Sequence, residues 1–566
     1  MPNAPETKRR DNAGTSKTVA VQQIIDLFGF IGLHELAPAV DGLLSRPGQR
    51  GRRSPYPAVA LLATLVAARV TGSQAEALKT MRLPWVWEQC REQYRIRSKG
   101  VVLPLCAPGR DQARYMRDLL AQDAVRMEQL QARFQHLALG QARQLGNLLP
   151  GTAPQGTDPD ERNAIYSDGT IITPYSDVRV VTDPVTGELR AVGSRAKSVE
   201  SVRIQGVLSD TALDGKTTRG LNMVAVSTWT RAGRVVLGTG TALGAEQWAV
   251  LDVIDSLHAN LEQRDQGGVD GGGAIHTLIN DRAVTGWSVD YLMGALGIQV
   301  LSKAVGRTTD QRNQYCFDEK RPIGRLAAEL GVDPKGSAYP FLRHDVLADM
   351  VRYHRHMPVG LSVYPTSGGK LDRVASQTAE VNPASHVVDG QVCQHPLVLD
   401  DGALFMVEQH PEEGYLVKSR LLSCKSSTRY RRPDGRWGTR NSYDVPCPRG
   451  DFRYTRTWEP CGTRYTADSS EKNRAPKDSV GWQLRPLNRA DDIEEYFNDG
   501  VDIHEITRKR FTESFSRRND AESYNNWVKN KLTNKRATSD VIACQELDFL
   551  LAALLNNCLT WRNDKR

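Results

Sequence analysis

The chain has 566 residues, of which 40% are hydrophobic and 25% are charged, and its formal net charge is +8. This composition is ordinary for a globular protein of about two to four domains. No apolar run reaches the ~20 residues that a membrane-spanning helix needs, and the polar, basic N-terminus has no apolar stretch typical of a secretory signal. We therefore expect a cytoplasmic protein whose nine scattered cysteines are reduced thiols.

Helical patterns fill the first part of the chain. The segment YPAVALLATLVAARV is a nearly continuous apolar helix, and TGSQAEALKTM follows it, with Ser73 and Glu76 at the spacing of a capping box. Two helices joined by a Thr-Gly pair are typical of a helical hairpin, and a DNA-binding helix-turn-helix is the alternative. Residues 111–145 predict one long amphipathic helix.

The pattern changes at Ala164 to strands that alternate with helices. Strands are expected at 164–177, 222–230, 234–243, 275–284 and 298–304, a weaker strand at 202–211, and helices at 244–263 and 286–297. The second and third of these strong strands are separated by a short turn, so we expect them to pair antiparallel. Three such strands followed by helix, strand, helix and strand have the order of a ribonuclease-H-like α/β core.

These patterns predict an α/β protein: a ribonuclease-H-like mixed sheet with flanking helices, interrupted by a β-rich insertion and preceded by an all-α domain. The expected parts are a disordered basic arm (1–18), a helical domain that binds DNA (19–150), a linker (151–163), the first part of the core (164–304), a basic β-rich insertion (305–500) and the C-terminal helices of the core (501–566).

Positive charge is concentrated between Tyr415 and Arg474, where 14 Lys and Arg face 6 Asp and Glu, a surplus equal to that of the whole chain. Seven Tyr, Trp and Phe residues are interleaved with these cations. Cations among flat aromatic rings suit a polyanion whose bases can stack, which indicates nucleic acid. An exposed β-rich module with ordinary charged edges is the alternative.

Two aspartates stand at informative places in the expected core. Asp168 lies within the first strand, and Asp281 ends the fourth. A carboxylate at a buried strand is costly unless something offsets its desolvation, and a divalent cation would do so. Taken singly, each also fits a structural role, because Asp-Gly is common in turns and Asn-Asp can cap a helix.

The segment FSRRNDAESYNNWVK predicts a helix with a mixed face. At about 100° per residue, Phe515, Arg518, Glu522, Asn526 and Lys529 fall within a sector of about 80°. Neighbouring cations favour the ionised form of Glu522, and they could hold phosphates beside a metal. An intrahelical Arg518–Glu522 pair, worth only about 0.2–0.5 kcal/mol, explains two of these residues but not the whole face.

Here the chain resembles the DDE insertion-sequence transposases that carry a Y-R-E-K signature. Phe515-x2-Arg518-x3-Glu522-x6-Lys529 has the spacing of that signature, with Phe515 where the family usually has Tyr. The order of an Asp in the first strand, an Asp after the fourth and a Glu on a late helix also agrees, as does the long insertion before that helix.

The resemblance implies the catalytic residues, cofactors and partners. Asp168, Asp281 and Glu522 would be catalytic and hold two Mg²⁺ ions, with Mn²⁺ able to substitute. Phe515, Arg518, Asn526 and Lys529 would line the bound DNA, although Phe515 lacks the hydroxyl of the usual Tyr. The partners would be double-stranded DNA at terminal inverted repeats and target sites, with a homodimer on that DNA, in a bacterial cytoplasm.

Two other functions remain open: an inactive or domesticated relative that binds DNA without cutting it, and a nuclease with the same core but no strand transfer. The hypothesis predicts that the three carboxyl groups converge and that the basic stretch is continuous with them. Should Glu522 lie far from both aspartates, the replacement candidates are Glu505, Glu513 and Asp520.

Three further motifs favour other chemistry only weakly. Cys424, Cys447 and Cys461 with His410 could bind zinc, but the chain has no C-x2-C pair there. The run GGVDGGG is not a phosphate-binding P-loop sequence. His344, His354 and His356 are adequately explained as surface residues of a basic helix.

Overall fold

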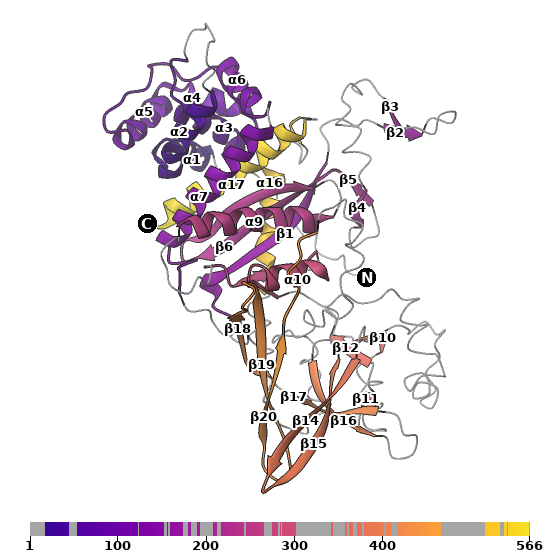
Figure 1. The fold of residues 1–566 in the computed structure, drawn as a ribbon. Coiled ribbons are helices and arrows are strands. Elements are labelled where there is room, and N and C mark those ends of the chain that lie inside the picture. The colour runs from indigo at the N-terminus through magenta and orange to yellow at the C-terminus, as the bar shows by residue number, and fades with distance from the viewer. Residues whose placement is uncertain are drawn as a thin grey trace, which may run out of the picture. The chain divides into compact units, whose positions relative to one another are not determined.

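The computed structural model (Figure 1) describes only part of the chain, and all structural statements below concern that part. The described residues are 17–44, 54–122, 124–151, 156, 159–173, 179–182, 189–192, 208–211, 217–242, 245–264, 274–280, 283–284, 286–301, 341–342, 357–358, 361–365, 371–375, 379–400, 403–409, 416–422, 424–465, 516–532, 537–539 and 541–564.

The chain forms two compact units, each built from separate stretches of sequence. The first comprises Met1–Gly146, Gly169–Ala249 and Ser523–Arg566, and the second comprises Asn147–Asp168 and Val250–Glu522. Strand β1 (Ala164–Ile172), helix α9 (Glu246–Arg264) and helix α16 (Asn519–Asn530) each begin in one unit and end in the other.

The first unit contains a helical domain. Its helices are α1 (Lys17–Gly29), α2 (Ile31–Leu44), α3 (Ala58–Thr71), α4 (Gln74–Met81), α5 (Pro84–Arg97), α6 (Arg110–Leu120) and α7 (Ala124–Gln144). Helix α3 is buried from Ala58 to Val70 because its sequence is apolar on every side, and α1, α2 and α4 pack around it. Gly72, at φ 73°, ends α3 in the left-handed conformation that glycine adopts readily.

The predicted hairpin of strands is confirmed in the same unit. Strands β6 (Leu221–Thr230) and β7 (Gly233–Ala242) pair antiparallel, with a bulge after Val226. Helices α7 and α17 (Ile542–Asp564) pack against β7. Two small antiparallel pairs also belong to this unit: β2 (Arg179–Thr182) with β3 (Leu189–Val192), and β4 (Leu208–Thr211) with β5 (Thr217–Arg219).

The central sheet is mixed, with the strand order β7-β6-β1-β8-β9. In the second unit, β8 (Thr277–Ile279) lies parallel to both β1 and β9 (Gln299–Leu301). Ala164, Tyr166, Ile279 and Leu301 form a buried cluster within these three strands. Helix α10 (Trp287–Gly294), buried at every position, connects β8 to β9. The expected mixed α/β architecture is therefore confirmed.

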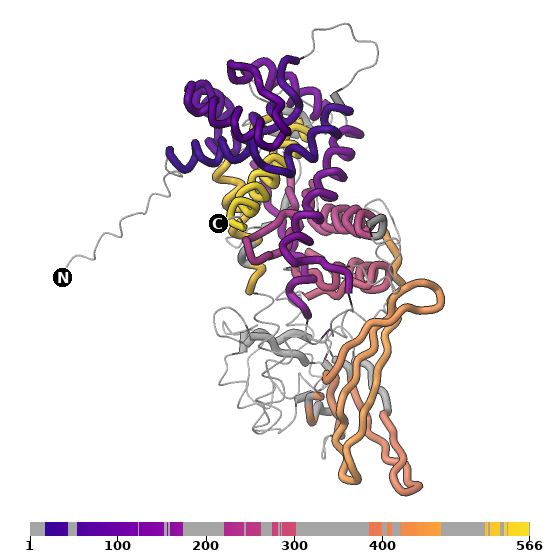
Figure 2. The backbone as a smooth tube through the Cα atoms, turned by 90° about the vertical axis from the view of Figure 1, so that its left-hand side faces the viewer, coloured from indigo at the N-terminus to yellow at the C-terminus, as the bar shows by residue number. Residues whose placement is uncertain are grey.

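Three further sheets of the second unit consist of strands that follow β9 in the chain (Figure 1). The long strands of the later part of this region are the orange segments of Figure 2. Their orders are β10-β13-β12, β11-β17-β16-β15-β14 and β18-β19-β20. The strands are β10 (Phe341–Leu342), β11 (Met357–Pro358), β12 (Leu361–Pro365), β13 (Leu371–Ala375), β14 (Ala379–Val388), β15 (Gln391–Asp400), β16 (Ala403–Gln409), β17 (Leu416–Leu422), β18 (Cys424–Arg431), β19 (Trp437–Val445) and β20 (Phe452–Trp458).

Two local predictions in the helical domain are wrong. The single helix expected at 111–145 is two helices, because the chain leaves α6 at Ala121 and the Arg126 side chain donates to the Leu119 carbonyl across the break. No Pro or Gly marks that break. Ser73 does occupy the position before α4, but its side chain makes no capping hydrogen bond, so the capping box does not form.

The expectation that no segment could span a membrane also needs correction. By length and composition, α17 is the one single helix in the described residues that could do so, and 67% of its most apolar window is buried inside the structure. The pairs α1–α2 and α3–α4 meet the same criteria only if each bent pair is counted as one span.

Candidate active site

Strand β1 places Asp168 at a half-buried position, directly after four buried residues. The strand is buried from Ala164 to Ser167 and half-buried at Asp168 and Gly169. The first part of β1 is enclosed by β8 on one edge and by the cluster around Tyr166, which fixes the backbone that carries the aspartate. Asp168 therefore stands on a rigid strand at the edge of the packed interior.

The end of β8 is tied to β1 beside Asp168. The Asn280 side chain, 1% exposed, donates to the Ser167 Oγ at 2.8 Å and approaches the Ser167 carbonyl at 3.4 Å. Its own oxygen accepts from the backbone N–H groups of Ala283 and Val284. Asp281, the second predicted catalytic residue, lies outside the described residues, next to Asn280 in the sequence.

Helix α16 carries Glu522, the third predicted carboxylate. Arg518 Nη2 donates to Glu522 Oε1 at 2.5 Å, and the two side chains differ in exposure, 9% for Arg518 and 56% for Glu522. The intrahelical pair considered from the sequence is thus present. The buried guanidinium thus fixes one oxygen of an exposed carboxylate.

One turn after Glu522, α16 is tied to β1. The Asn525 side chain, 6% exposed, donates to the Gly169 carbonyl at 3.1 Å. Tyr524 beside it is buried under the Arg234 guanidinium, 5.3 Å from the ring centroid, and Val528 continues the buried face. Buried residues recur at helical spacing on this side of α16, so the helix packs with this side against the protein interior.

The remaining predicted DNA-binding residues have different surroundings. Asn526 is exposed and Lys529 is half-buried on α16, whereas Phe515 lies outside the described residues. Of the replacement candidates, Asp520 lies on α16, and Glu505 and Glu513 are outside the described residues. No distance among the three predicted catalytic carboxyl groups follows from these placements, so their convergence stays a prediction.

Three residues at this place were not among the predicted site residues. Asn280 and Asn525 make the two contacts to β1, and Glu246 at the start of α9 lies so close that a methyl group on Gly169 would come within 2.4 Å of its carboxyl group. Glycine is therefore the residue that this approach permits. The sequence does show Asn280 next to Asp281 and Asn525 three residues after Glu522. Glu246, in contrast, resembles any acidic residue at a helix N-terminus.

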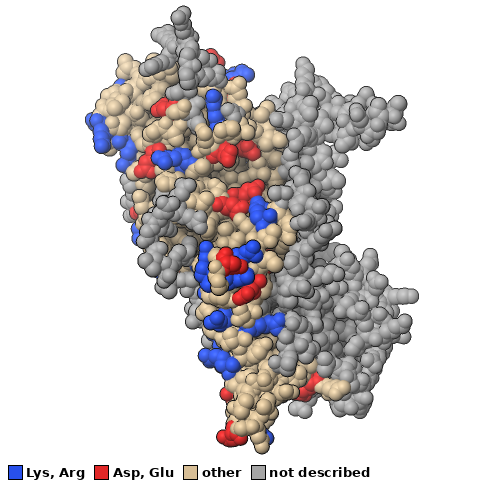
Figure 3. Space-filling view, viewed as in Figure 1, with Lys and Arg blue, Asp and Glu red and all other residues tan. Residues whose placement is uncertain are grey.

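The part of the basic aromatic stretch from Cys424 to Trp458 forms the sheet β18-β19-β20, and several of its arginines stack on aromatic rings of the same sheet. The Arg429 and Arg431 guanidiniums lie 4.8 and 4.9 Å from the Trp437 ring centroid, and Arg440 lies 5.1 Å from that of Tyr430. Figure 3 shows Lys and Arg atoms on this face in small groups, several of them next to Asp or Glu atoms. Stacking inside the sheet agrees with the alternative of an ordinary charged module.

Comparison with known proteins adds no assignment. No protein-family model matches the chain, and a search of curated proteins finds no match. The functional argument therefore depends on the residues of the chain itself.

Proposed function

We propose that this chain is a DDE transposase, which cleaves DNA at transposon ends and joins it to target DNA using divalent metal ions. The fold supports the proposal at the level of architecture. Numbered along the chain, the core strands run 3-2-1-4-5 across the sheet, with 3 and 2 antiparallel and 1, 4 and 5 parallel. This is the arrangement that a ribonuclease-H-like core requires, but fold alone does not define function.

The observation that carries the proposal is a pair of hydrogen bonds to β1 on either side of Asp168. Asn280 donates to Ser167, and Asn525 donates to Gly169. Asp281 follows Asn280 directly in the sequence, and Glu522 precedes Asn525 by one helical turn. The end of β8 and helix α16, which are distant in sequence, are thus each hydrogen-bonded to a residue next to Asp168. Each of these two elements has a predicted catalytic carboxylate close to its contact.

The donor chemistry fits the expected cofactor. Carboxylate oxygens are the ligands that Mg²⁺ prefers, with Mn²⁺ as a substitute, and Asp168, Asp281 and Glu522 would hold the ions. Bound metal would activate the attacking oxygen and stabilise the leaving one. Arg518 would orient Glu522 through their 2.5 Å hydrogen bond, so that the carboxylate does not have to be ordered when the metal binds.

The partners in this proposal are the terminal inverted repeats and the target DNA. Phe515, Arg518, Asn526 and Lys529 would contact the DNA strand that is presented to the metals; of these, Asn526 and Lys529 lie on α16 and Arg518 directly precedes it. The helical domain would contribute sequence recognition: α3 and α4 are bent by 114° at Gly72, within the range of helix-turn-helix motifs. Joining two ends requires at least a dimer on DNA, in the cytoplasm beside the nucleoid.

Cleavage of the inverted repeats that flank the coding sequence tests the proposal. Purified wild-type protein should nick a terminal-repeat duplex in Mg²⁺ or Mn²⁺ and join the released 3′-hydroxyl end to target DNA. Glu522→Gln keeps the size of the side chain but removes a metal ligand, so we expect the nicking rate to fall by at least about 1000-fold, with DNA binding retained.

Glu128→Gln is the matched control, because it makes the same chemical change at an exposed residue of α7 that is not among the proposed site residues. It should nick at the wild-type rate. DNA binding without any nicking by the wild type would favour the inactive relative, and nicking without joined products would favour the nuclease. Equal nicking by wild type and Glu522→Gln would refute the catalytic assignment.

A further inference from the structure

One face of the β14–β15 hairpin carries three residues that can bind metal. The hairpin turns at Asp389 and Gly390, both with positive φ, which is typical of the two-residue turns that join twisted strands. His386 pairs with Cys393 across the two strands, and His395 follows Cys393 by two positions. Because side chains alternate between faces of a strand, His386, Cys393 and His395 all lie on the same face.

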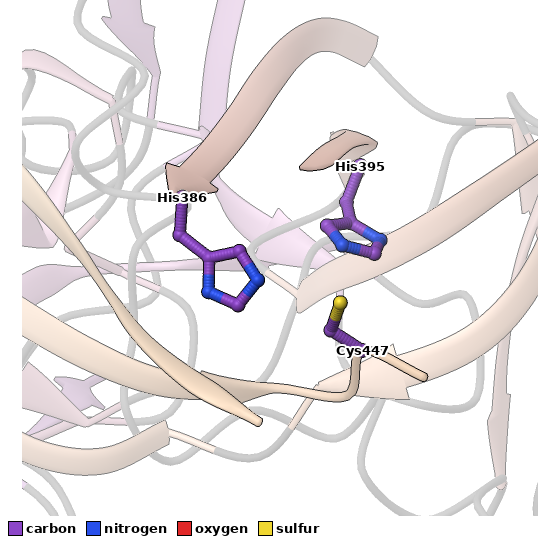
Figure 4. A group of neighbouring side chains, drawn as sticks. All are labelled: His386, His395 and Cys447. Atoms are coloured by element: carbon purple, nitrogen blue, oxygen red, sulfur yellow. The ribbon is translucent and has the colours of Figure 1, made fainter. Parts of the chain in front are cut away.

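A fourth residue comes from a different sheet. Cys447 lies between β19 and β20 and is 8% exposed. One ligand atom from each of His386, His395 and Cys447 lies within 4.8 Å of the other two, and Figure 4 shows the three side chains pointing toward one another. In the described residues this is the one group of three or more His, Cys, Asp or Glu close enough to share an ion.

Each of the two half-buried imidazoles has one buried nitrogen without a hydrogen bond. Nε2 of His386 and Nε2 of His395 are both inaccessible to water and have no hydrogen-bond partner. The Phe452 ring covers both, with centroids 4.1 Å from that of His386 and 5.5 Å from that of His395. Leaving a buried polar atom unsatisfied costs about 1–3 kcal/mol, so two such atoms facing one cysteine call for an explanation.

Cys393 completes the group. It lies close enough to Cys447 for the two thiols to interact, and it is half-buried. Two imidazoles and two thiols from two hairpins are the ligand set of many structural zinc sites.

We propose that His386, His395, Cys447 and Cys393 bind one Zn²⁺ ion that joins the β14–β15 hairpin to the β19–β20 turn. Tetrahedral zinc would bring its ligand atoms to about 3.3–3.8 Å from one another, so a shift of about 1 Å from the present arrangement suffices. The ion would satisfy both orphaned nitrogens and link the two hairpins, which a hydrogen bond from Arg449 to Gln391 also joins.

This site differs from the zinc site considered from the sequence. Of Cys424, Cys447 and Cys461, only Cys447 belongs to the group, and His410 lies outside the described residues. The ligand spacing H-x6-C-x-H followed by a cysteine 52 residues later resembles no common zinc motif. Antiparallel pairing, which the sequence does not reveal, brings these residues together.

Metal analysis of the full-length protein tests the proposal. Protein purified from zinc-supplemented medium and dialysed should contain about one zinc per chain. Cobalt added to metal-free protein should give a thiolate-to-cobalt charge-transfer band, which carboxylate sites cannot produce. Cys447→Ser and His395→Asn should each weaken zinc binding by about 100-fold or more, and Cys393→Ser should weaken it and reduce the band.

Cys106→Ser is the control, because Cys106 is an exposed free thiol in the first unit, and it should retain zinc and the cobalt band. If a ligand variant fails to fold, the cobalt titration of the wild type still decides. A missing charge-transfer band, or a Cys393–Cys447 disulfide in protein purified without oxidant, would overturn the site. An unchanged Cys393→Ser protein would remove Cys393 from it. None of these outcomes depends on transposase activity.

Discussion

At the scale of single residues, buried amides rather than carboxylates hold the candidate active site together. Asn280 and Asn525 can be buried because a neutral amide with backbone partners loses little on leaving water, whereas an ionised carboxylate loses much more. The carboxylates Asp168 and Glu522 stand next to these contacts and remain partly accessible. The contacts that fix the scaffold around the two carboxylates are thus made by neutral amide groups.

Asp548 on α17 is the counterexample, a buried carboxylate whose role is structural. Arg69 of α3 and Arg117 of α6 lie 3.7 and 3.3 Å from its oxygens, and Thr538 donates to it. The Asp548 side chain is 5% exposed. Removing it would leave the buried Arg69 charge without its counter-ion.

We therefore predict that Asp548→Ala destabilises the first unit by about 3–5 kcal/mol, the cost of breaking a buried ion pair from one side. Urea unfolding followed by circular dichroism measures this. Asp564→Ala is the control: it removes the same chemical group from the exposed pair with Arg231, and it should cost less than about 1 kcal/mol. Similar losses for the two variants would show that the Asp548 pair contributes no more than a surface pair.

At the scale of secondary structure, α17 shows how polar residues fix the packing of an apolar helix. The Asn557 side chain accepts from the Val236 N–H at 2.8 Å and donates to the Val236 carbonyl at 2.9 Å. Strand β7 is the last strand of the central sheet on this side, so its outer backbone groups have no strand to pair with. Asn557 supplies the missing partner and fixes the position of α17 along the strand.

Asn557→Ala should destabilise the first unit by about 1–3 kcal/mol for each of the two buried backbone groups that lose a partner. The neighbouring Asn556 makes one hydrogen bond to β7, to the Arg234 carbonyl, and is less buried. Asn556→Ala is thus a matched control that should cost about 1 kcal/mol. Thermal and urea unfolding provide the measurement, and an equal effect of the two substitutions would contradict the edge-pairing role of Asn557.

At the scale of the whole molecule, the sequence predicts what depends on local periodicity. The strands of the core, their antiparallel hairpin and the burial of α17 follow from apolar patterns, because these patterns reflect which faces are buried. The break between α6 and α7 does not, since no Pro or Gly marks it in the sequence; in the structure the Arg126 side chain donates to the Leu119 carbonyl across the break.

The residues of the candidate sites also differ in whether the sequence alone can predict that they lie together. The spacing around Glu522 and its Arg518 partner could be read from the sequence because both lie on one helix. The contacts of Asn280, Asn525 and Glu246 with β1, and the grouping of His386, His395 and Cys447, join residues far apart in the chain. Only the pairing of strands and the docking of helices bring them together.

The charge distribution of the chain leads to a last prediction, about DNA binding. The excess of cations lies in the stretch that forms β18, β19 and β20, and the guanidiniums of Arg431 and Arg440 are exposed over aromatic rings there. Stacked cations of this kind can contact phosphates while the rings hold them in place. If this sheet contacts DNA, Arg431 and Arg440 each neutralise a phosphate and so release counterions from the DNA.

The double variant Arg431→Gln/Arg440→Gln should then bind terminal-repeat DNA about 10-fold more weakly, and the slope of log K against log salt should fall by about 1.8. Fluorescence anisotropy at several salt concentrations measures both quantities. Arg162→Gln/Arg231→Gln removes two exposed charges that lie outside both the helical domain and β18–β20, and it keeps the net charge equal to that of the test variant. Equal slopes for the two variants would mean that net charge alone matters and that β18–β20 is an ordinary charged module. A smaller slope only for the first variant would place DNA on this sheet.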